Sequence, residues 1–133
     1  MAWLDRSHPD HARCEEALFR WSGEEPLAIS SATYAELAAG GRTREALEED
    51  LRIFQRLDLD CEAAWRAGMA FGRAYPGRKG LKPVLPDFFV RAQAAALGCR
   101  HLTNDRRRLT AFPEVEFVFP EPPSSRARLP RLD

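Results

Sequence analysis

The chain has 133 residues, of which 44% are hydrophobic and 30% charged, and its formal net charge is zero. This composition is typical of one globular domain, and the balanced charge argues against a strong non-specific nucleic-acid binder. No run of about 18 apolar residues and no apolar N-terminal segment is present, so we expect neither a membrane span nor a secretory signal. Cys14, Cys61 and Cys99 lie far apart, and we interpret them as reduced thiols of a cytoplasmic protein.

The N-terminal half of the chain is expected to alternate between helices and short strands. Ser22-Gly23 is a typical helix end, and Ser31 or Thr33 could cap the helix that carries Glu36. In chain order we predict a helix from about Pro9 to Trp21, a strand at Leu27–Ser30, a helix ending at Gly40, a helix from Thr43 to Phe54, and a strand at Leu57–Leu59.

The C-terminal half continues this alternation after a loop at Pro76–Leu85 that is rich in Gly, Pro and basic residues. The helix Pro86–Leu97 is apolar apart from Asp87, Arg91 and Gln93, so it should be largely buried. We predict helices at 61–75 and 86–97, strands at 100–103 and 115–119, and a helical turn at 106–111. Residues 1–119 are expected to form the domain, and residues 120–133 a disordered tail.

Strands that alternate with helices predict an α/β fold with a parallel sheet between helical layers, in which ligands bind at the carboxyl ends of the strands. Glu36, Asp87 and Asp105 are each the only acid in a long stretch of chain, and this frame places all three at one edge. Acids among apolar segments are costly unless something pairs them, and a divalent cation pairs several at once. The pattern therefore favours a Mg²⁺ or Mn²⁺ site suited to phosphodiester chemistry.

Each of these acids also has a purely structural interpretation. Asp87 could complement a helix dipole, Asp105 could be an N-cap or turn residue, and Glu36 could be an exposed helix residue. The expected placement of all three acids at one edge of the sheet favours the metal site over these structural roles. If clustered carboxylates repel one another there, Asp87→Asn should raise the stability of the metal-free protein.

Several segments resemble those of PIN-domain ribonucleases. Ile29–Leu37 is similar to the family's YAE segment, Leu85–Phe89 followed by Ala92–Ala94 resembles its LPDFF helix, and Leu102–Arg107 resembles its LTND turn. Ala67–Phe71 is similar to a helix of one subfamily. The match spans about residues 8–120, and the nearest described members are VapC-type toxins of toxin–antitoxin pairs.

The resemblance implies a three-layer α/β/α fold and an endoribonuclease that depends on Mg²⁺ or Mn²⁺ and hydrolyses RNA phosphodiester bonds. It carries over Glu36, Asp87 and Asp105 as catalytic metal ligands, with Thr103 and Asn104 as supporting residues. It also implies a small antitoxin partner and a homodimer. Basic residues flank the acids and are candidates for RNA backbone contacts, unless they only solvate a loop and a helix turn: Arg78, Lys79, Lys82 and Arg106–Arg108.

Two other functions stay open at this point. One is a catalytically incomplete PIN scaffold that still binds an antitoxin, and the other is a phosphohydrolase acting on small phosphates. The first alternative arises because the family has a fourth acid on an N-terminal strand. Here only Leu4-Asp5-Arg6-Ser7 is superficially similar to that motif, and the first helix follows almost at once. We expect residues 1–7 to be helical or irregular, Asp5 to lie outside the acidic cluster, and the family's first strand to lie upstream of Met1.

Overall fold

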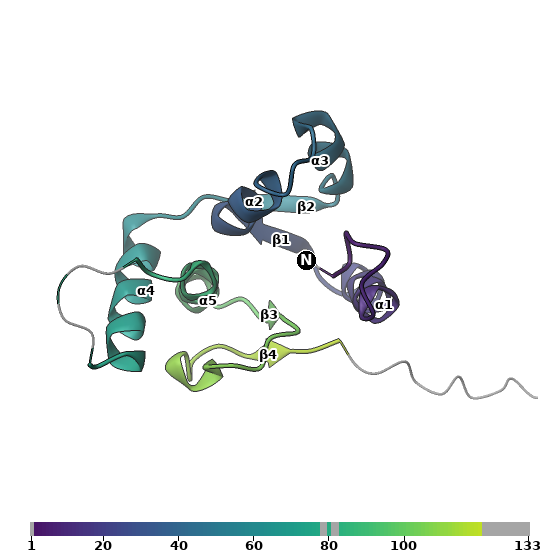
Figure 1. Ribbon diagram of the computed structural model, residues 1–133. Coiled ribbons are helices and arrows are strands. Elements are labelled where there is room, and N and C mark those ends of the chain that lie inside the picture. Colours follow the sequence, from purple (N-terminus) through teal and green to yellow (C-terminus); the bar gives the residue numbers. More distant parts are fainter. Residues whose placement is uncertain (1, 78–79, 81–82, 121–133) are drawn as a thin grey trace, which may run out of the picture.

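The computed structural model describes residues 2–77, 80 and 83–120, and these have the alternating order of an α/β protein (Figure 1). The elements are α1 His11–Ser22, β1 Leu27–Ser30, α2 Ser31–Ala38, α3 Arg44–Asp50, β2 Phe54–Leu57, α4 Cys61–Ala74, α5 Pro86–Leu97, β3 His101–Leu102, the 3-10 turn η1 Leu109–Ala111, and β4 Phe117–Val118. The predicted tail lies outside the described residues beyond position 120. Within the described ranges, no helix is both long and apolar enough to cross a bilayer.

Local signals explain where most helices begin and end. The side chains of Ser30, Thr43 and Asp60 each accept a hydrogen bond from a backbone N–H in the first turn of the helix that follows. The cap of α2 is thus Ser30, one residue before the first of the two predicted candidates. Pro86 occupies the first turn of α5, and Gly98 ends this helix with a φ of 67°, a conformation that glycine adopts without steric cost.

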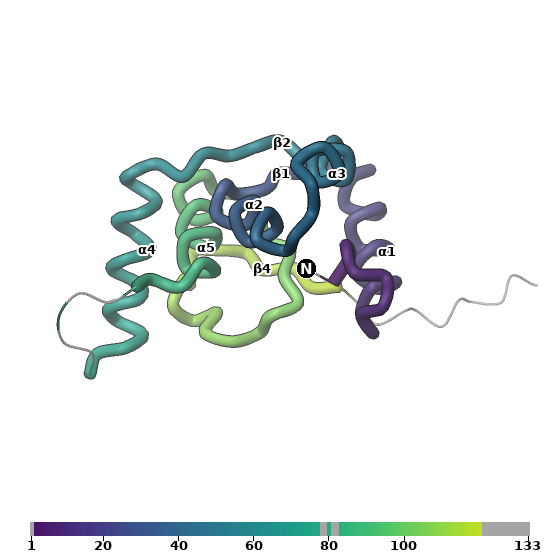
Figure 2. Tube along the Cα trace, turned by 45° about the horizontal axis from the view of Figure 1, so that its top comes forward, coloured from purple at the N-terminus to yellow at the C-terminus, as the bar shows by residue number. Residues whose placement is uncertain are grey.

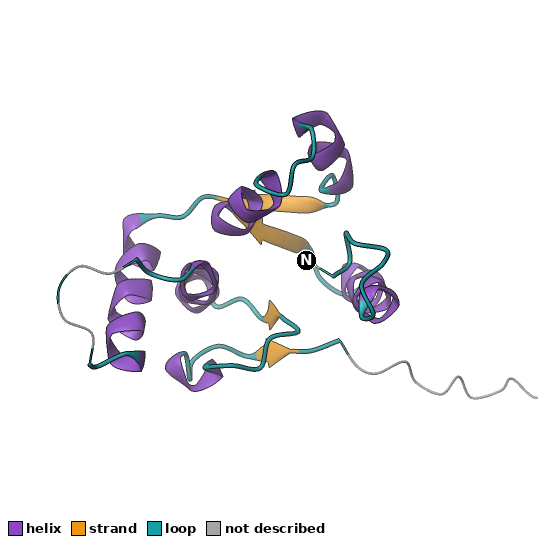
Figure 3. Cartoon of the chain, viewed as in Figure 1, coloured by secondary structure: helices purple, strands orange, loops and turns teal. Residues whose placement is uncertain are grey.

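The strands pair in parallel, as the alternation predicted. β1 pairs with β2 from Leu27 opposite Phe54 to Ser30 opposite Leu57, and β3 pairs with β4 through His101 opposite Phe117. In the described part of the chain these pairs form two separate two-stranded sheets rather than one continuous sheet (Figure 3).

The prediction was wrong about where α3 ends and β2 begins. We expected a helix as far as Phe54 and a strand at Leu57–Leu59, but α3 ends at Asp50 and Phe54 already opens β2. The cause is tertiary: Phe54 pairs with β1, and its ring lies 5.4 Å from that of Trp3. Contacts of this kind override a local helical pattern, because strand propensity depends on the neighbours that a side chain packs against.

The apolar core consists of two clusters. The larger lies between α4, α5 and η1, where Phe88 is completely buried and its ring lies 5.3 Å from Phe71 and 5.6 Å from Phe112. The smaller joins β1 to α3 through Ile29 and Leu47. Figure 2 shows α4 running beside α5, at a distance from α1 and α3. The position of α5 is therefore set by its buried face against α4 and η1.

The N-terminal segment has the irregular conformation that we expected. Residues 2–7 form turns, and the Asp5 carboxylate accepts hydrogen bonds from the backbone N–H and the hydroxyl of Ser7 at 2.9 and 2.6 Å. Both hydrogen bonds lower the pKa of Asp5, and the bond from the Ser7 hydroxyl has the larger effect. The Leu4 carbonyl accepts a hydrogen bond from Arg42 in the loop between α2 and α3, and Trp3 packs against Phe54 of β2. Asp5 thus serves a local turn.

Candidate active site

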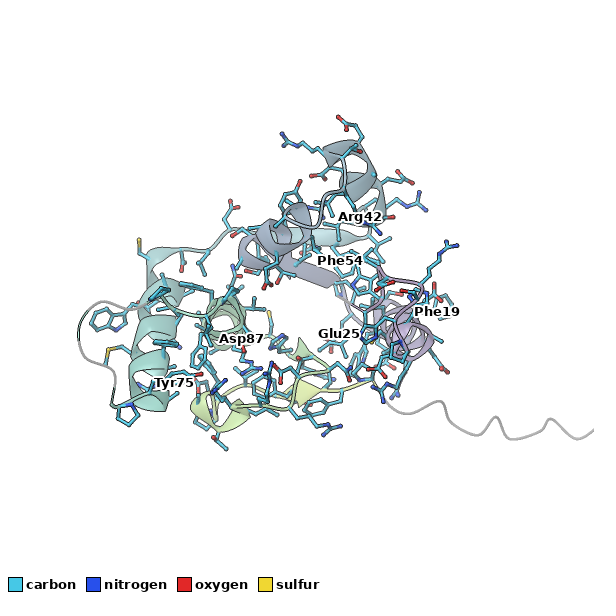
Figure 4. All side chains as sticks on the ribbon, in the orientation of Figure 1. Phe19, Glu25, Arg42, Phe54, Tyr75 and Asp87 are labelled. Atoms are coloured by element: carbon cyan, nitrogen blue, oxygen red, sulfur yellow. The ribbon has the colours of Figure 1, made fainter. Side chains whose placement is uncertain are left out.

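Asp87 and Asp105 converge on the guanidinium group of Arg91. Asp87 lies in the first turn of α5, and Arg91 follows four residues later, on the same face of the helix. The Nη2 atom of Arg91 lies 3.5 Å from Oδ2 of Asp87 and 3.9 Å from Oδ2 of Asp105. Figure 4 shows Asp87 on the side of α5 that faces β3 and η1. Two carboxylates from distant parts of the sequence therefore share one cationic nitrogen.

Arg91 is a buried charge with well-defined partners. Its side chain is 1% exposed, and its Nη1 donates a hydrogen bond of 2.9 Å to the backbone carbonyl of Arg107. The guanidinium carbon lies 5.8 Å from the centre of the Phe117 ring. Its Nε atom is buried and has no hydrogen-bond partner among the described residues. A buried cation is tolerated only when it is paired, so Arg91 depends on Asp87 and Asp105.

Asp105 is held by a second arginine. Arg107 donates from Nε to Oδ1 and from Nη2 to Oδ2, both at 2.9 Å, and its backbone N–H also donates to Oδ1. The side-chain bonds from Arg107 are the main reason why the pKa of Asp105 is lowered to about 2. The Thr103 hydroxyl accepts a hydrogen bond from the Asp105 backbone N–H at 3.1 Å, which fixes the turn. Asp105 is therefore ionised at any physiological pH.

The turn that carries Asp105 is attached to the start of α1 through Asn104. The Asn104 side-chain N–H donates to Asp10 at 2.9 Å, and its carbonyl accepts from Arg13 at 3.1 Å. Arg13 also pairs with Asp10 at 2.7 Å, so the three side chains form a closed network. Thr103 and Asn104 thus hold the Asp105 turn through hydrogen bonds, and their supporting role in a metal site stays a prediction.

Glu36 is not part of the group formed by the two aspartates. It lies on α2, which packs against α5, and its side chain is exposed. Across residues 2–77, 80 and 83–120, no three His, Cys, Asp or Glu side chains are close enough together to hold a metal ion. Two of the three predicted ligands are therefore brought to one place, and the three-carboxylate site stays a prediction.

The pair of aspartates fits a small hard cation in donor type and in number. Carboxylate oxygens are the preferred protein ligands of Mg²⁺, which is usually bound by one or two carboxylates together with waters and substrate phosphates. Asp87 and Asp105 provide these two carboxylates, and their side chains are 39% and 31% exposed, so both can be reached from solvent.

The basic residues have more specific contacts than the sequence indicated. Arg78, Lys79 and Lys82 lie outside the described residues. The Arg106 guanidinium carbon lies 3.9 Å from the centre of the Phe119 ring, Arg107 holds Asp105, and the Arg108 guanidinium carbon lies 4.7 Å from the centre of the Tyr75 ring. A contact with RNA is still a prediction for each of them.

Sequence reasoning missed the roles of Arg91 and His101. A usable signal existed for Arg91, because it is the only cation of α5 and lies four residues after Asp87. No comparable pattern marks His101, whose Nδ1 atom is buried without a hydrogen-bond partner among the described residues. Burial, followed by the nearby Arg91 charge, lowers the pKa of His101 to about 4.

The lowered pKa of His101 predicts a stability change in mild acid. Folding disfavours the protonated form of His101. The stability that this adds to the folded state is therefore fully present above the ordinary pKa of 6.5 and is lost as the pH falls toward about 4. We expect the free energy of unfolding to fall by about 1–2 kcal/mol over this range. This is less than the full pKa shift of His101 would give, because the side chain is partly exposed and solvent screens its charge. Urea titrations from pH 7 to pH 4 measure it, with His101→Gln as control. An equal loss in that variant would show that other groups cause it.

Comparisons with known proteins identify the family and the fold of the chain. The PIN domain family model matches residues 1–117. One similar solved structure is the crystal structure of VapBC2 from Rickettsia felis bound to a DNA fragment from their promoter. It superimposes with a TM-score of 0.63 at 21% identity, covering 88% of this chain and 90% of that one. No curated protein matches. With its α/β order, parallel strands and a family match over most of its length, this chain belongs to the PIN-domain family.

Proposed function

We propose that this chain is a metal-dependent endoribonuclease and the toxin component of a toxin–antitoxin pair. The convergence of Asp87 and Asp105 on one cationic nitrogen is the observation that carries this proposal, because it supplies two carboxylates for Mg²⁺ or Mn²⁺. PIN domains are generally nucleases, and the similar structure from Rickettsia felis is a VapBC complex. By analogy, the proposed partners are a small antitoxin protein and a second copy of this chain.

The proposed roles follow from the contacts. When bound, a divalent ion supplies a more acidic water and positive charge for the phosphodiester oxygens. Asp105 is suited to bind such an ion rather than to donate a proton, because its pKa of about 2 keeps it ionised. Asp87 faces the same place from a helix fixed by its buried side. Glu36 is the proposed third ligand, and it would have to approach them from α2.

A second function is favoured by a specific observation. Arg91 and Arg107 already engage the two aspartates, and the described residues gather no third acid beside them. A chain with this arrangement would act as a catalytically incomplete PIN scaffold that binds an antitoxin but cleaves nothing.

Cleavage of a mixed pool of short RNAs distinguishes the two functions. With Mg²⁺ or Mn²⁺ the nuclease should cut RNA, and chelation with EDTA should stop it. Asp105→Asn should reduce the rate by about 100-fold or more, because the neutral amide lacks the negative charge with which a carboxylate attracts a divalent cation.

Glu114→Gln is the matched control, since Glu114 is exposed and lies outside the site. Loss of activity only in Asp105→Asn supports the nuclease. A wild-type protein that binds a small partner but has no metal-dependent activity supports the scaffold. Hydrolysis of a generic phosphate ester in place of RNA would contradict both.

A further inference from the structure

We infer that Arg91 is a built-in cation of the acidic site, which lies within ion-pair distance of both Asp87 and Asp105 and weakens the binding of a divalent ion there. This inference rests on the proposed function, since it takes the two aspartates to be the metal ligands. It concerns a residue on the buried face of α5, which would act on the ion through its charge.

The geometry of the ion pairs is the first argument. A single atom, Nη2 of Arg91, lies 3.5 Å from Asp87 and 3.9 Å from Asp105. Both distances are longer than a hydrogen bond and within the range of a charge pair. The fixed positive charge of Arg91 would therefore lie close to any divalent ion that the two carboxylates bind together.

The charge balance is the second argument. Asp87 and Asp105 carry two negative charges, and Arg91 and Arg107 carry two positive charges within contact distance. The site is therefore neutral before any ion arrives. A divalent cation binds such a neutral group less strongly than it would bind two unpaired carboxylates.

The two arginines differ in how easily they can leave. The Arg107 side chain is 79% exposed, so it can turn into solvent and release Asp105 at little cost. The Arg91 side chain is 1% exposed, and the backbone carbonyl of Arg107 holds its Nη1 atom. When an ion binds, Arg107 can move away while Arg91 stays. The fixed charge of Arg91 then repels the ion and also disfavours a second ion in the same site.

A purely structural role for Arg91 predicts the opposite effect. If Arg91 only held α5 to the Arg107 segment, its removal would loosen Asp87 and Asp105 and weaken metal binding. If Arg91 acts through its charge, replacing it by a neutral side chain of similar length should strengthen metal binding. The direction of the change in affinity therefore separates the two roles.

Titration of Mn²⁺ into the purified protein, followed by calorimetry and by the electron paramagnetic resonance of free Mn²⁺, measures that affinity directly. Arg91→Met removes the charge and keeps an unbranched apolar side chain. Arg91→Lys keeps the charge and is the matched control, and Asp87→Asn tests whether the ion binds at this site.

We expect Arg91→Met to bind Mn²⁺ about tenfold more tightly or better, from the loss of one nearby like charge. Arg91→Lys should stay within about threefold of the wild type, since its charge remains. Asp87→Asn should bind more weakly than the wild type. The wild type should bind one ion per chain and not two.

Other outcomes overturn the inference in distinguishable ways. If Arg91→Met binds no more tightly than the wild type while Asp87→Asn still weakens binding, the metal site stands and the role of Arg91 is wrong. If no variant binds Mn²⁺, the proposed function fails and the inference fails with it. Circular dichroism shows whether the variants fold. If Arg91→Met does not, Arg91→Gln carries the same expectation, because its amide can still donate to the Arg107 carbonyl. Two ions bound to the wild type would also overturn the inference.

Discussion

Replacing Phe88 by alanine is expected to lower the free energy of unfolding by about 4 kcal/mol, the usual cost of a large cavity in an aromatic core. Phe88 is completely buried, and its ring lies 5.3 Å from Phe71, 5.6 Å from Phe112 and 6.3 Å from Tyr75. Few smaller side chains could move in to fill the space. Urea denaturation followed by far-ultraviolet circular dichroism measures the loss.

Phe19→Ala is the matched control for this prediction. Phe19 lies on α1 and is 82% exposed, so its removal should change the stability by less than about 0.5 kcal/mol. Similar losses in the two variants would show that the α4–α5 cluster is not the main core. Phe88 also directly follows Asp87, so the same cavity should disturb the position of that carboxylate.

Asp87→Asn is expected to lower the stability of the metal-free protein by about 2 kcal/mol. The sequence favoured a gain, from relief of repulsion between carboxylates. The structure reverses the expected sign, because Asp87 is a counter-charge for the buried Arg91. Removing one partner of a buried pair leaves a charge poorly compensated. The loss should be at the lower end of such effects, because Asp105 and the Arg107 carbonyl still contact Arg91.

A double-mutant cycle with Arg91→Met tests this explanation. If the ion pair is the cause, Asp87→Asn should cost much less in the Arg91→Met background than in the wild type. Thermal or urea denaturation in EDTA measures all four proteins. A gain in stability from Asp87→Asn alone would show that repulsion between the carboxylates outweighs the ion pair.

The sequence was sufficient for the elements whose signals are local. Pro86 and Gly98 mark the ends of α5, and the limits predicted for this helix are those observed. The convergence of Asp87 and Asp105 also followed from the sequence, because it needs only the order of one helix and one strand. A long amphipathic or buried helix with clear ends is the feature that sequence patterns predict best.

The features that the sequence did not predict depend on contacts between distant segments. Phe54 belongs to β2 because β1 and Trp3 lie beside it. Arg91 meets Asp105 and the Arg107 carbonyl only after the Asp105 turn folds back toward α5. The position of Glu36 depends on how α2 is oriented on α5, which no local pattern specifies.

The separation of the strands into two pairs determines what joins the two halves of the molecule. No backbone ladder links the described β1–β2 and β3–β4 pairs, and each half has its own apolar cluster. Polar side chains provide several of the links, including Asn104 with Asp10, Arg100 with Glu25 at 3.1 Å, and Gln93 with the Asp58 carbonyl at 2.8 Å. Because salt screens exposed charges, high ionic strength should weaken the Arg100–Glu25 link, whereas the buried, uncharged Gln93 hydrogen bond and the packing of α2 against α5 should persist.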